Sequence, residues 1–415
     1  MLEYWIWFSQ LGKLSDRSKR LLMQHYHDPE EIYYAEADAI GQIDGMTEDQ
    51  ISALQDKDLN NARAIEDECA KKGLKIVTFE DAAYPQRLKY IADPPMILYY
   101  KGKLPDWNDR PAIGVVGTRK ASAYGLTTAR KMGYQIARCG GIVVSGMARG
   151  IDSMAMDGAL LADSPTVGVL GCGADRIYPL SNRKLFEDVE RYGCILSEFA
   201  PGTEPLRWNF PKRNRIISGL SNGVLVVEAP EKSGALITAS QALDQGRDVF
   251  AIPGNVDQEG CAGSNKLLRS GAIFASCGWD VVSEYEALYP GQLHEDTTPM
   301  PGKAPETPLQ NPGEEACKVA QKPKHPRKKP DVPEKLDEKA IDKDTSGAYS
   351  DVNTVISRLI GEEQSVAKAL KSGECLVDDV IVETGLPARR VMAILTMLEI
   401  KGIVRRLPGK RVALK

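Results

Sequence analysis

The sequence AIGVVGTRKASAYG (residues 112–125) opens the stretch that decides the fold, and two similar stretches follow it. They are GIVVSGMARGID (141–152) and TVGVLGCGADR (166–176). Each begins with a short apolar run, turns at a glycine-rich loop and continues into an amphipathic segment. Runs that are apolar on both faces are typical of buried parallel strands with helices on either side. The pattern therefore predicts successive β-α-β units.

The same alternation continues to residue 285. Further strands are expected at CILSE (194–198), GVLVVEA (223–229), DVFAIPG (248–254) and AIFAS (272–276). Helices are expected over 122–138, 151–163, 182–192 and 235–245. Six or seven such strands predict an α/β domain with a doubly wound, mostly parallel, Rossmann-like sheet.

The segment before this core is helical in pattern. Residues 1–75 predict a small SAM-like or helix-hairpin-helix-like domain, with helices at Asp16–Tyr26, Pro29–Glu36, Thr47–Gln55 and Asn60–Lys71. Ile43–Met46 resembles half of a helix-hairpin-helix turn, whose amides could hold a phosphate. It carries one glycine where such hairpins usually carry two, so an ordinary packing role and direct DNA contact both stay open. We place the Rossmann-like core at 76–286, with 76–110 as its lead-in.

The segments after the core differ in composition. Residues 290–333 hold ten of the 25 prolines, which predicts a Pro-rich flexible linker over 287–350. Residues 351–415 give two helices, a turn at Thr384–Pro387, a helix from Ala388 and two short strands, the order of a winged helix. Winged helices bind nucleic acid or protein, and both stay open. If DNA binds, the candidate contacts are Arg389, Arg390, Arg405 and Arg406.

Composition excludes several classes of protein. The 415 residues allow two to four domains, and 53 Lys and Arg against 57 Asp and Glu rule out a general polycation. Any anion-binding surface must therefore be local. No apolar run approaches the ~18 residues of a membrane span, and the N-terminus lacks a secretion signal, so we expect a cytoplasmic chain without membrane contact. The 8 cysteines are scattered and the 4 histidines lie outside the α/β stretch, which predicts no metal, no cofactor and no Ser-His or Cys-His catalysis there.

Glycine and arginine gather in the loops that leave the first two predicted strands, at residues 117–122 and 145–152. In an open parallel sheet the ligand lies outside the carboxyl ends of the strands. Small residues let backbone amides approach an oxyanion at a helix N-terminus, and Arg119 and Arg149 can add guanidinium contacts. The two loops together predict an anion pocket.

The third loop, residues 171–176, resembles a dinucleotide-binding fingerprint but has Arg176 in place of the third glycine. About twenty residues further on stands Arg191 rather than an acid, and the chain holds no G-x-x-x-x-G-K-[ST] sequence. These absences count against a hydride-transfer enzyme and an NTP-driven motor. Glu228, at the end of a predicted strand, is expected to have a structural role because no histidine or metal cluster lies near it.

Residues 207–215 (RWNFPKRNR) hold four cations, two aromatic residues and no acid. Cations that follow phosphates, with aromatic faces for bases, are typical of single-strand binding. Duplex DNA would hide those bases. The alternative is that Trp208 and Phe210 are core residues and the arginines pair with acids such as Glu198 and Glu228.

Taken together, these motifs resemble those of the bacterial DNA-processing protein A (DprA/Smf) family. The stretches that carry the resemblance are VGTRKASAYG (116–125), SGMARGIDSMA (145–155), GCGADRIYP (171–179), SEFAPGTEPLRWNFPKRNRIISGLS (197–221), VVEAPEKSGALITA (226–239) and GRDVFAIPGNV (246–256). The resemblance implies a homodimeric, non-enzymatic protein that binds and protects single-stranded DNA in natural transformation. It also implies that the protein loads RecA recombinase onto strands coated by single-strand binding protein.

The resemblance and the loops together name the residues that we expect to contact DNA. They are Gly117, Thr118, Arg119, Lys120, Ser122, Ser145, Gly146, Arg149, Gly150, Arg176, Phe210, Lys212, Arg213, Asn214 and Arg215. Where the family usually has Ala-His, this chain has Ala155-Met156. If that histidine touches DNA in relatives, its contact is absent here.

Two other functions stay open. A nucleotide-binding hydrolase of the phosphoribohydrolase kind shares a related fold, but its Pro-Gly-Gly-x-Gly-Thr-x-x-Glu pattern is missing, and Pro253-Gly254-Asn255 is the nearest approach. A winged-helix transcription factor that senses a nucleotide would read base edges with Arg389 and Arg390. It would then prefer particular duplex sequences.

Overall fold

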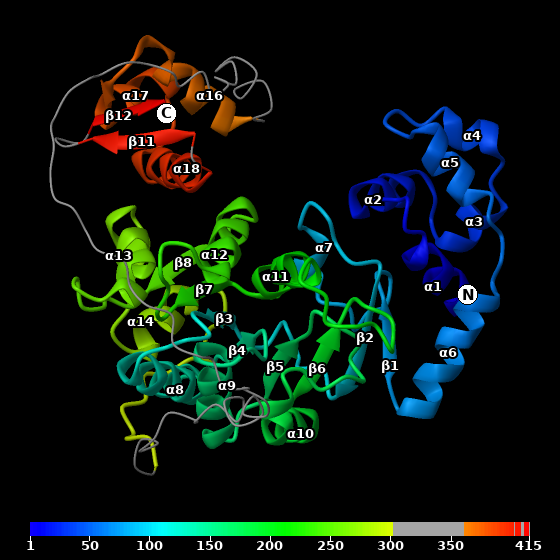
Figure 1. The fold of residues 1–415 in the computed structure, drawn as a ribbon, viewed down its shortest axis with the longest axis horizontal. Helices are drawn as coiled ribbons and strands as arrows, with labels where there is room; N and C mark the ends of the chain where they lie inside the picture. Colours follow the sequence, from blue (N-terminus) through cyan, green and yellow to red (C-terminus); the bar gives the residue numbers. More distant parts are fainter. Residues whose placement is uncertain (302–360, 402, 408–410, 415) are drawn as a thin grey trace, which may run out of the picture.

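Within the described residues, nine strands form one sheet through the middle of the molecule (Figure 1). The structure is a computed structural model that describes residues 1–301, 361–401, 403–407 and 411–414. The strand order is β1-β2-β6-β5-β4-β3-β7-β8-β9. The strands are β1 (Lys75–Thr78), β2 (Ile97–Gly102), β3 (Ala112–Val116), β4 (Ile142–Ser145), β5 (Thr166–Val169), β6 (Cys194–Ser197), β7 (Gly223–Val226), β8 (Asp248–Ala251) and β9 (Ile273–Phe274).

The strands β3 to β9 are parallel, which confirms the seven predicted strands and the Rossmann-like sheet. β2 pairs antiparallel with both β1 and β6, so the lead-in segment extends the sheet at one edge. The sequence analysis predicted no strand in that segment. Here β2 pairs with β6, about a hundred residues further along the chain, and β1 is added outside β2.

Helices cover both faces of the sheet. One face packs against α8 (Ala123–Arg138), α9 (Ile151–Leu161), α10 (Arg183–Tyr192) and α14 (Gly278–Val282). The other packs against α7 (Gln86–Lys89), α11 (Asn209–Leu220), α12 (Gly234–Asp244) and α13 (Ala262–Arg269). Successive β4 residues alternate between the two buried clusters, as the two-residue period of a strand requires. Among the described helices, none combines the length and the apolar surface that a bilayer-spanning helix needs.

The N-terminal helices pack on the β1–β2 edge of the sheet. They are α1 (Leu2–Gln10), α2 (Asp16–His25), α3 (Pro29–Tyr34), α4 (Ala37–Gly41), α5 (Glu48–Leu54) and α6 (Asn60–Lys72). Four lie where the sequence predicted helices, while α1 and α4 were not predicted. α1 was missed because its run Tyr4–Phe8 is buried throughout and so lacks the polar face of an amphipathic helix. Ile43–Met46 forms the turn between α4 and α5, closed by a hydrogen bond from Met46 N to Ile43 O (3.2 Å).

The core continues past residue 286, where the sequence analysis placed the start of the linker. Tyr289 is buried, and its hydroxyl accepts a hydrogen bond from Arg87 Nη2 (2.6 Å). Leu293 is also buried, and Asp296 pairs with Arg138 at 2.7 Å. Residues 302–350 of the predicted linker lie outside the described residues.

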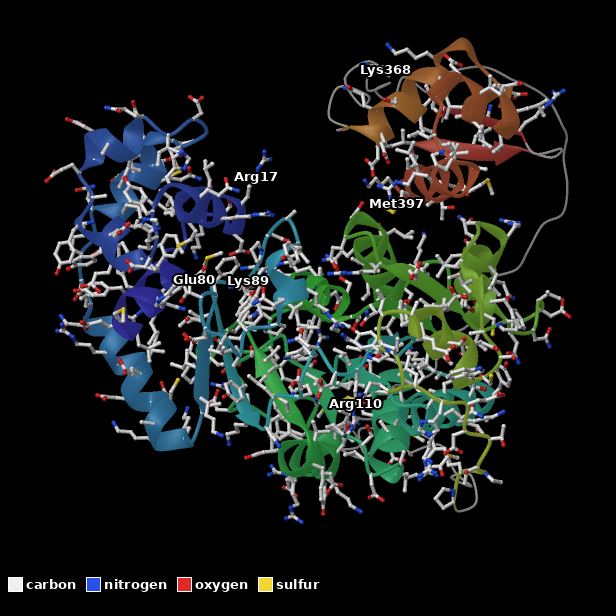
Figure 2. All side chains as sticks on the ribbon, turned by 180° about the vertical axis from the view of Figure 1, so that it is seen from behind. Arg17, Glu80, Lys89, Arg110, Lys368 and Met397 are labelled. Carbon is white, nitrogen blue, oxygen red and sulfur yellow. The ribbon has the colours of Figure 1, made fainter. Side chains whose placement is uncertain are left out.

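The C-terminal part is a winged helix, as predicted. It contains α16 (Glu362–Ala369), α17 (Val377–Thr384) and α18 (Ala388–Ile400), with β10 (Cys375–Leu376), β11 (Val404–Leu407) and β12 (Arg411–Leu414). The three strands form a sheet in the order β10-β12-β11. α18 faces α12 and α13 of the core, and Figure 2 shows Met397 on the side of α18 that is turned toward the core.

Candidate nucleic-acid interface

The loops that follow β3, β4 and β5 gather at the carboxyl edge of the parallel sheet, because the carboxyl ends of parallel strands point the same way. The strand order changes direction between β3 and β7, since later strands are added on both sides of β3. Such a switch point is where open α/β sheets bind ligands. The first two predicted loops therefore lie at the expected edge.

The first loop is held in place by Glu228, which follows β7. Its carboxylate accepts a hydrogen bond from Ser122 N (3.0 Å) and another from Ser122 Oγ (2.6 Å). Ser122 Oγ in turn accepts the N–H of Gly125 (3.0 Å) and caps α8. Glu228 is 2% exposed and thus has the expected structural role. The Ser122 hydroxyl, a predicted DNA contact, is occupied within the protein.

The second loop packs closely on the first. Gly150 has φ +81°, and a Cβ there would lie 2.4 Å from Thr118 O, so a larger residue would be strained and would clash. Ile151 N donates to the same oxygen (3.3 Å). Ser145 is buried and donates through Oγ to Val115 O (2.6 Å). Ser145 therefore points into the protein, and Gly150 allows the close contact between the two loops.

Arg213 lies beneath the second loop and is 4% exposed. Its Nη1 donates to Gly146 O (2.8 Å) and to Val169 O, which ties the loops after β4 and β5 together. A Cβ at Gly146 would lie 2.6 Å from Nη2 of Arg213, so the guanidinium requires glycine there. Burial lowers the pKa of Arg213 to about 10, so it stays charged at neutral pH. Burial also raises the pKa of Asp152, the nearby acid that accepts the N–H of Gly146 (3.1 Å).

The prediction that Arg213 contacts DNA is not supported by this arrangement. Its guanidinium is enclosed by backbone carbonyls, and a phosphate could reach it only if the loops came apart. Asn214 is likewise engaged, since it accepts from Arg213 Nε (3.2 Å) and donates to Gly234 O (3.4 Å).

Arg119, Lys120 and Arg149 are the exposed cations of the two loops. Among the residues that the structure describes, none of the three makes an ion pair; Arg149 donates through Nε to Ser181 Oγ (3.1 Å). Thr118 is half-buried beside them. Cations without acidic partners at a sheet edge can bind an anion with little competition from within the protein.

Phe210, at the start of α11, brings an aromatic face to these cations. The guanidinium of Arg119 lies over its ring at 5.2 Å from the centroid, and that of Arg213 at 5.9 Å. Tyr178 lies 5.6 Å from the same ring and is 37% exposed. Trp208, 70% exposed, is not a core residue. The sequence thus placed Phe210 and Arg119 in one site, and the structure brings them into contact.

Tyr178 is a candidate residue that the sequence analysis missed. It follows the third strand-end loop (171–176), from which only Arg176 was predicted to contact DNA. A search for aromatic residues in and just after that loop would have found it. Arg176 of the same loop is half-buried, donates to Gly202 O (2.8 Å) and pairs with Glu204 at 3.0 Å. It is therefore less available to an anion than Arg119.

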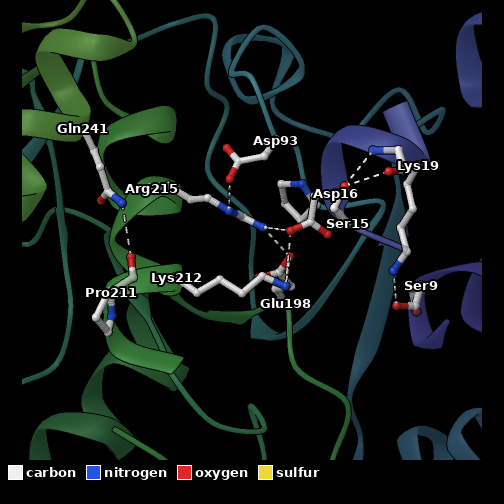
Figure 3. A network of polar contacts seen from close by, with 12 residues as sticks. Ser9, Ser15, Asp16, Lys19, Asp93, Glu198, Pro211, Lys212, Arg215 and Gln241 are labelled. Atoms are coloured by element: carbon white, nitrogen blue, oxygen red, sulfur yellow. Dashed lines mark hydrogen bonds and ion pairs between the residues drawn. The ribbon is translucent and has the colours of Figure 1, made fainter. Parts of the chain in front are cut away.

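Lys212 and Arg215 do not lie in this pocket but at the contact between α11 and the N-terminal helices (Figure 3). Arg215 is 3% exposed and forms ion pairs with Asp16 (3.0 Å), Glu198 (2.5 Å) and Asp93 (3.0 Å). Lys212, at the surface, pairs with Asp16 (3.2 Å) and Glu198 (3.6 Å). The predicted DNA contact of Arg215 is not supported, because three carboxylates enclose its guanidinium.

Electrostatics within this network follow from burial and pairing. Burial alone would lower the pKa of Arg215, but Glu198, Asp16 and Asp93 together raise it. Burial would raise the pKa of Asp16, but Arg215 and Lys212 hold it below the usual 3.8. Arg215 and Asp16 are therefore charged in the folded chain, and their ion pairs hold the N-terminal helices to the core.

The remaining predicted residues lie elsewhere. Met156, a residue of α9, is fully buried in the core, so this position packs rather than faces DNA. In the winged helix, Arg390 pairs with Glu362 at 2.6 Å and Arg405 lies 4.0 Å from Glu374. The side chains of Arg389 and Arg406 lie outside the described part of the chain.

The fold and this edge define a Rossmann-like protein that carries a winged helix and an exposed cation–aromatic site. The chain belongs to the DNA recombination-mediator protein A family, whose model matches residues 75–286. The model of the DprA winged helix domain matches residues 356–410.

Relatives match over different shares of the chain. Protein Smf of Synechocystis sp. is 33% identical over 413 residues, which cover 98% of this chain and 97% of that protein. DNA processing protein DprA of Bacillus subtilis is 44% identical over 214 residues, 52% of this chain and 72% of that protein. The X-ray structure of DNA processing protein A from Streptococcus pneumoniae superposes with a TM-score of 0.60 at 32% identity, covering 68% of this chain and 98% of that one.

Proposed function

We propose that this chain binds single-stranded DNA without sequence preference at the carboxyl edge of its sheet. The observation that carries the proposal is the guanidinium of Arg119, which has no ion pair within the described residues and lies over the half-exposed ring of Phe210. Lys120 and Arg149 supply further charge for phosphates, and Tyr178 supplies a second aromatic face. A base can stack on such rings only when it is not paired in a duplex, so the site favours single strands.

On this proposal the chain is a recombination mediator rather than an enzyme. It protects incoming single strands in the cytoplasm and loads RecA recombinase onto strands coated by single-strand binding protein, as a homodimer. Membership of the recombination-mediator family supports this role. Glu228, a carboxylate that a hydrolase could use at this edge, is instead bonded to Ser122, which supports binding without turnover.

Fluorescence anisotropy of a labelled oligonucleotide, single-stranded against duplex, tests the binding step. Arg119→Ala should weaken single-strand binding by about 1.5–3 kcal/mol, roughly tenfold to a hundredfold, because it removes a charged contact. The matched control is Arg191→Ala, which removes the same charge from an exposed arginine in the last turn of α10, shortly before β6 begins at the opposite edge of the sheet. Equal losses in the two variants, or a preference for duplex, would overturn the proposal.

The later steps need their own assay. RecA strand exchange on oligonucleotides coated with single-strand binding protein should be stimulated by the wild type and not by Arg119→Ala. Release of base or phosphate from nucleotides by the wild-type chain would favour the hydrolase instead.

A further inference from the structure

The helix α18 occupies the place of the recognition helix in a winged helix, yet the middle of its outward face is uncharged. Its inward residues Val391, Ile394, Leu395 and Leu398 pack in the domain's own core. The opposite side carries the uncharged Ala393, Thr396 and Met397, with Met392 packed partly in the domain's own core. Arg390 and Glu399 line the two ends of the gap between this side and the Rossmann-like core. Thr396 and Met397 are each 4% exposed although they lie outside the domain's own core, because the Rossmann-like core covers them.

The contacts that cover this face come from α12 and from the end of α13. Thr396 Oγ1 donates to Ser270 O (2.6 Å), and Ser240 Oγ donates to Met397 Sδ (3.4 Å). Figure 2 shows Met397 between the winged helix and the core. Hydrogen bonds at the neighbouring positions 396 and 397 favour one orientation of α18 on the α12–α13 surface.

Among the described side chains, the cations at the ends of α18 pair with acids of the winged helix itself. Arg390 Nε pairs with Glu362 at 2.6 Å, and Lys401 Nζ pairs with Glu363 at 2.9 Å. Lys401 also lies 4.0 Å from Asp244, the last residue of α12. A helix that reads the major groove needs free donors and cations to reach bases and phosphates. The described side chains of α18 offer a small, uncharged face between paired charges.

We propose that the outward face of α18 is a protein-docking surface, and that its partner is the α12–α13 face of this chain's own core. In this arrangement α18 does not read duplex DNA. The winged helix instead contacts the core through the surface that DNA-binding winged helices place in the major groove of DNA. This proposal is independent of the single-strand site, which lies at the loops after β3, β4 and β5.

Disulfide trapping in the full-length chain tests the contact directly. The pair Ser240→Cys with Met397→Cys should form a bond within one chain under mild oxidation, seen as faster migration on a non-reducing gel. The control pair, Ser240→Cys with Val382→Cys, should not, since Val382 is 82% exposed on α17. The wild type gives the background of the native cysteines. A covalent dimer in place of the fast monomer, or no bond, would overturn docking within the chain.

Substitutions that should separate the winged helix from the core provide a second test. Thr396→Arg in α18 and Ser240→Arg in α12 insert a bulky charge from opposite sides, so that misfolding of one domain cannot explain both. Each should enlarge the radius of gyration by small-angle X-ray scattering, while Val382→Arg leaves it unchanged. Duplex affinity should not rise. An unchanged radius in both variants contradicts the docking, and a gain in duplex affinity that Met392→Glu abolishes contradicts the assignment of α18 to protein.

Discussion

Arg119 and Arg213 lie against the same aromatic ring but have different surroundings. Arg119 is exposed and, within the described residues, has no acidic partner, whereas Arg213 is buried and bonded to two carbonyls. A buried arginine holds neighbouring loops in place, and an exposed one remains available to a ligand. Their roles therefore differ although both belong to arginine-rich motifs.

Replacing Arg213 should destabilise the fold. We expect Arg213→Met to lower the free energy of unfolding by about 2–6 kcal/mol, because Gly146 O and Val169 O would each lose a buried donor, at about 1–3 kcal/mol each. Urea unfolding followed by circular dichroism measures the loss. Arg119→Met, at the surface, should change the value by less than about 0.5 kcal/mol. Similar costs for both would contradict the division of roles.

The ring of Phe210 should act on bases rather than phosphates. Phe210→Leu keeps an apolar side chain but removes the stacking face, so single-strand binding should weaken by about 1–3 kcal/mol. Anisotropy with an abasic oligonucleotide of the same length supplies the control. On that strand the wild type and Phe210→Leu should bind alike, and an equal loss on both strands would show that the ring only supports Arg119.

At the scale of elements, α11 carries two functions on its two sides. Phe210 faces the loops of the sheet edge, while Arg215 faces α2 and its Asp16. One cation-rich segment therefore contributes both to the proposed DNA site and to a domain contact. The first turn of α11 contains a residue of each, Phe210 for the proposed site and Lys212 for the domain contact.

The contact between α2 and α11 should depend on pH in a particular direction. Asp16 has a lowered pKa in the folded chain, so its stabilising effect is complete above about pH 4 and is lost as the pH falls through the lower native value. The difference in unfolding free energy between wild type and Asp16→Asn should thus be largest near pH 6 and shrink below pH 4. Urea titrations across this range measure it. Asp257→Asn, an exposed change, should show no such trend.

At the scale of the whole molecule, the chain carries a net charge of -4 but is expected to bind a polyanion. This is possible because Arg119, Lys120 and Arg149 lie at one edge of the sheet, exposed and without an ion pair among the described residues, while ion pairs occupy the N-terminal contact and the winged helix. The field at that edge is local and is screened within about 8 Å at physiological salt. Binding should therefore depend strongly on salt.

A salt series quantifies this dependence. The slope of log affinity against log salt for single strands falls by about 0.7 for each phosphate contact removed. Arg119→Ala should reduce the slope by about that amount, and Arg191→Ala should leave it unchanged. An unaltered slope in Arg119→Ala would mean that Arg119 does not contact a phosphate.

The sequence by itself determined the parallel strands, the winged helix and the edge at which the glycine-arginine loops lie. These features are local: apolar runs, helical period and turn residues are properties of consecutive positions, and the carboxyl ends of parallel strands must meet. The chain order therefore sufficed to place Arg119 and Arg149 together.

Only the tertiary structure decided which cations reach solvent. Arg215 pairs with Asp16, 199 positions away, and Arg213 bonds to Gly146 O, 67 positions away. Likewise α18 has the sequence of a recognition helix, and only its contact with Ser270 revealed a docked face. Burial and pairing depend on residues that are distant along the chain, and a motif contains no information about what will pack against it.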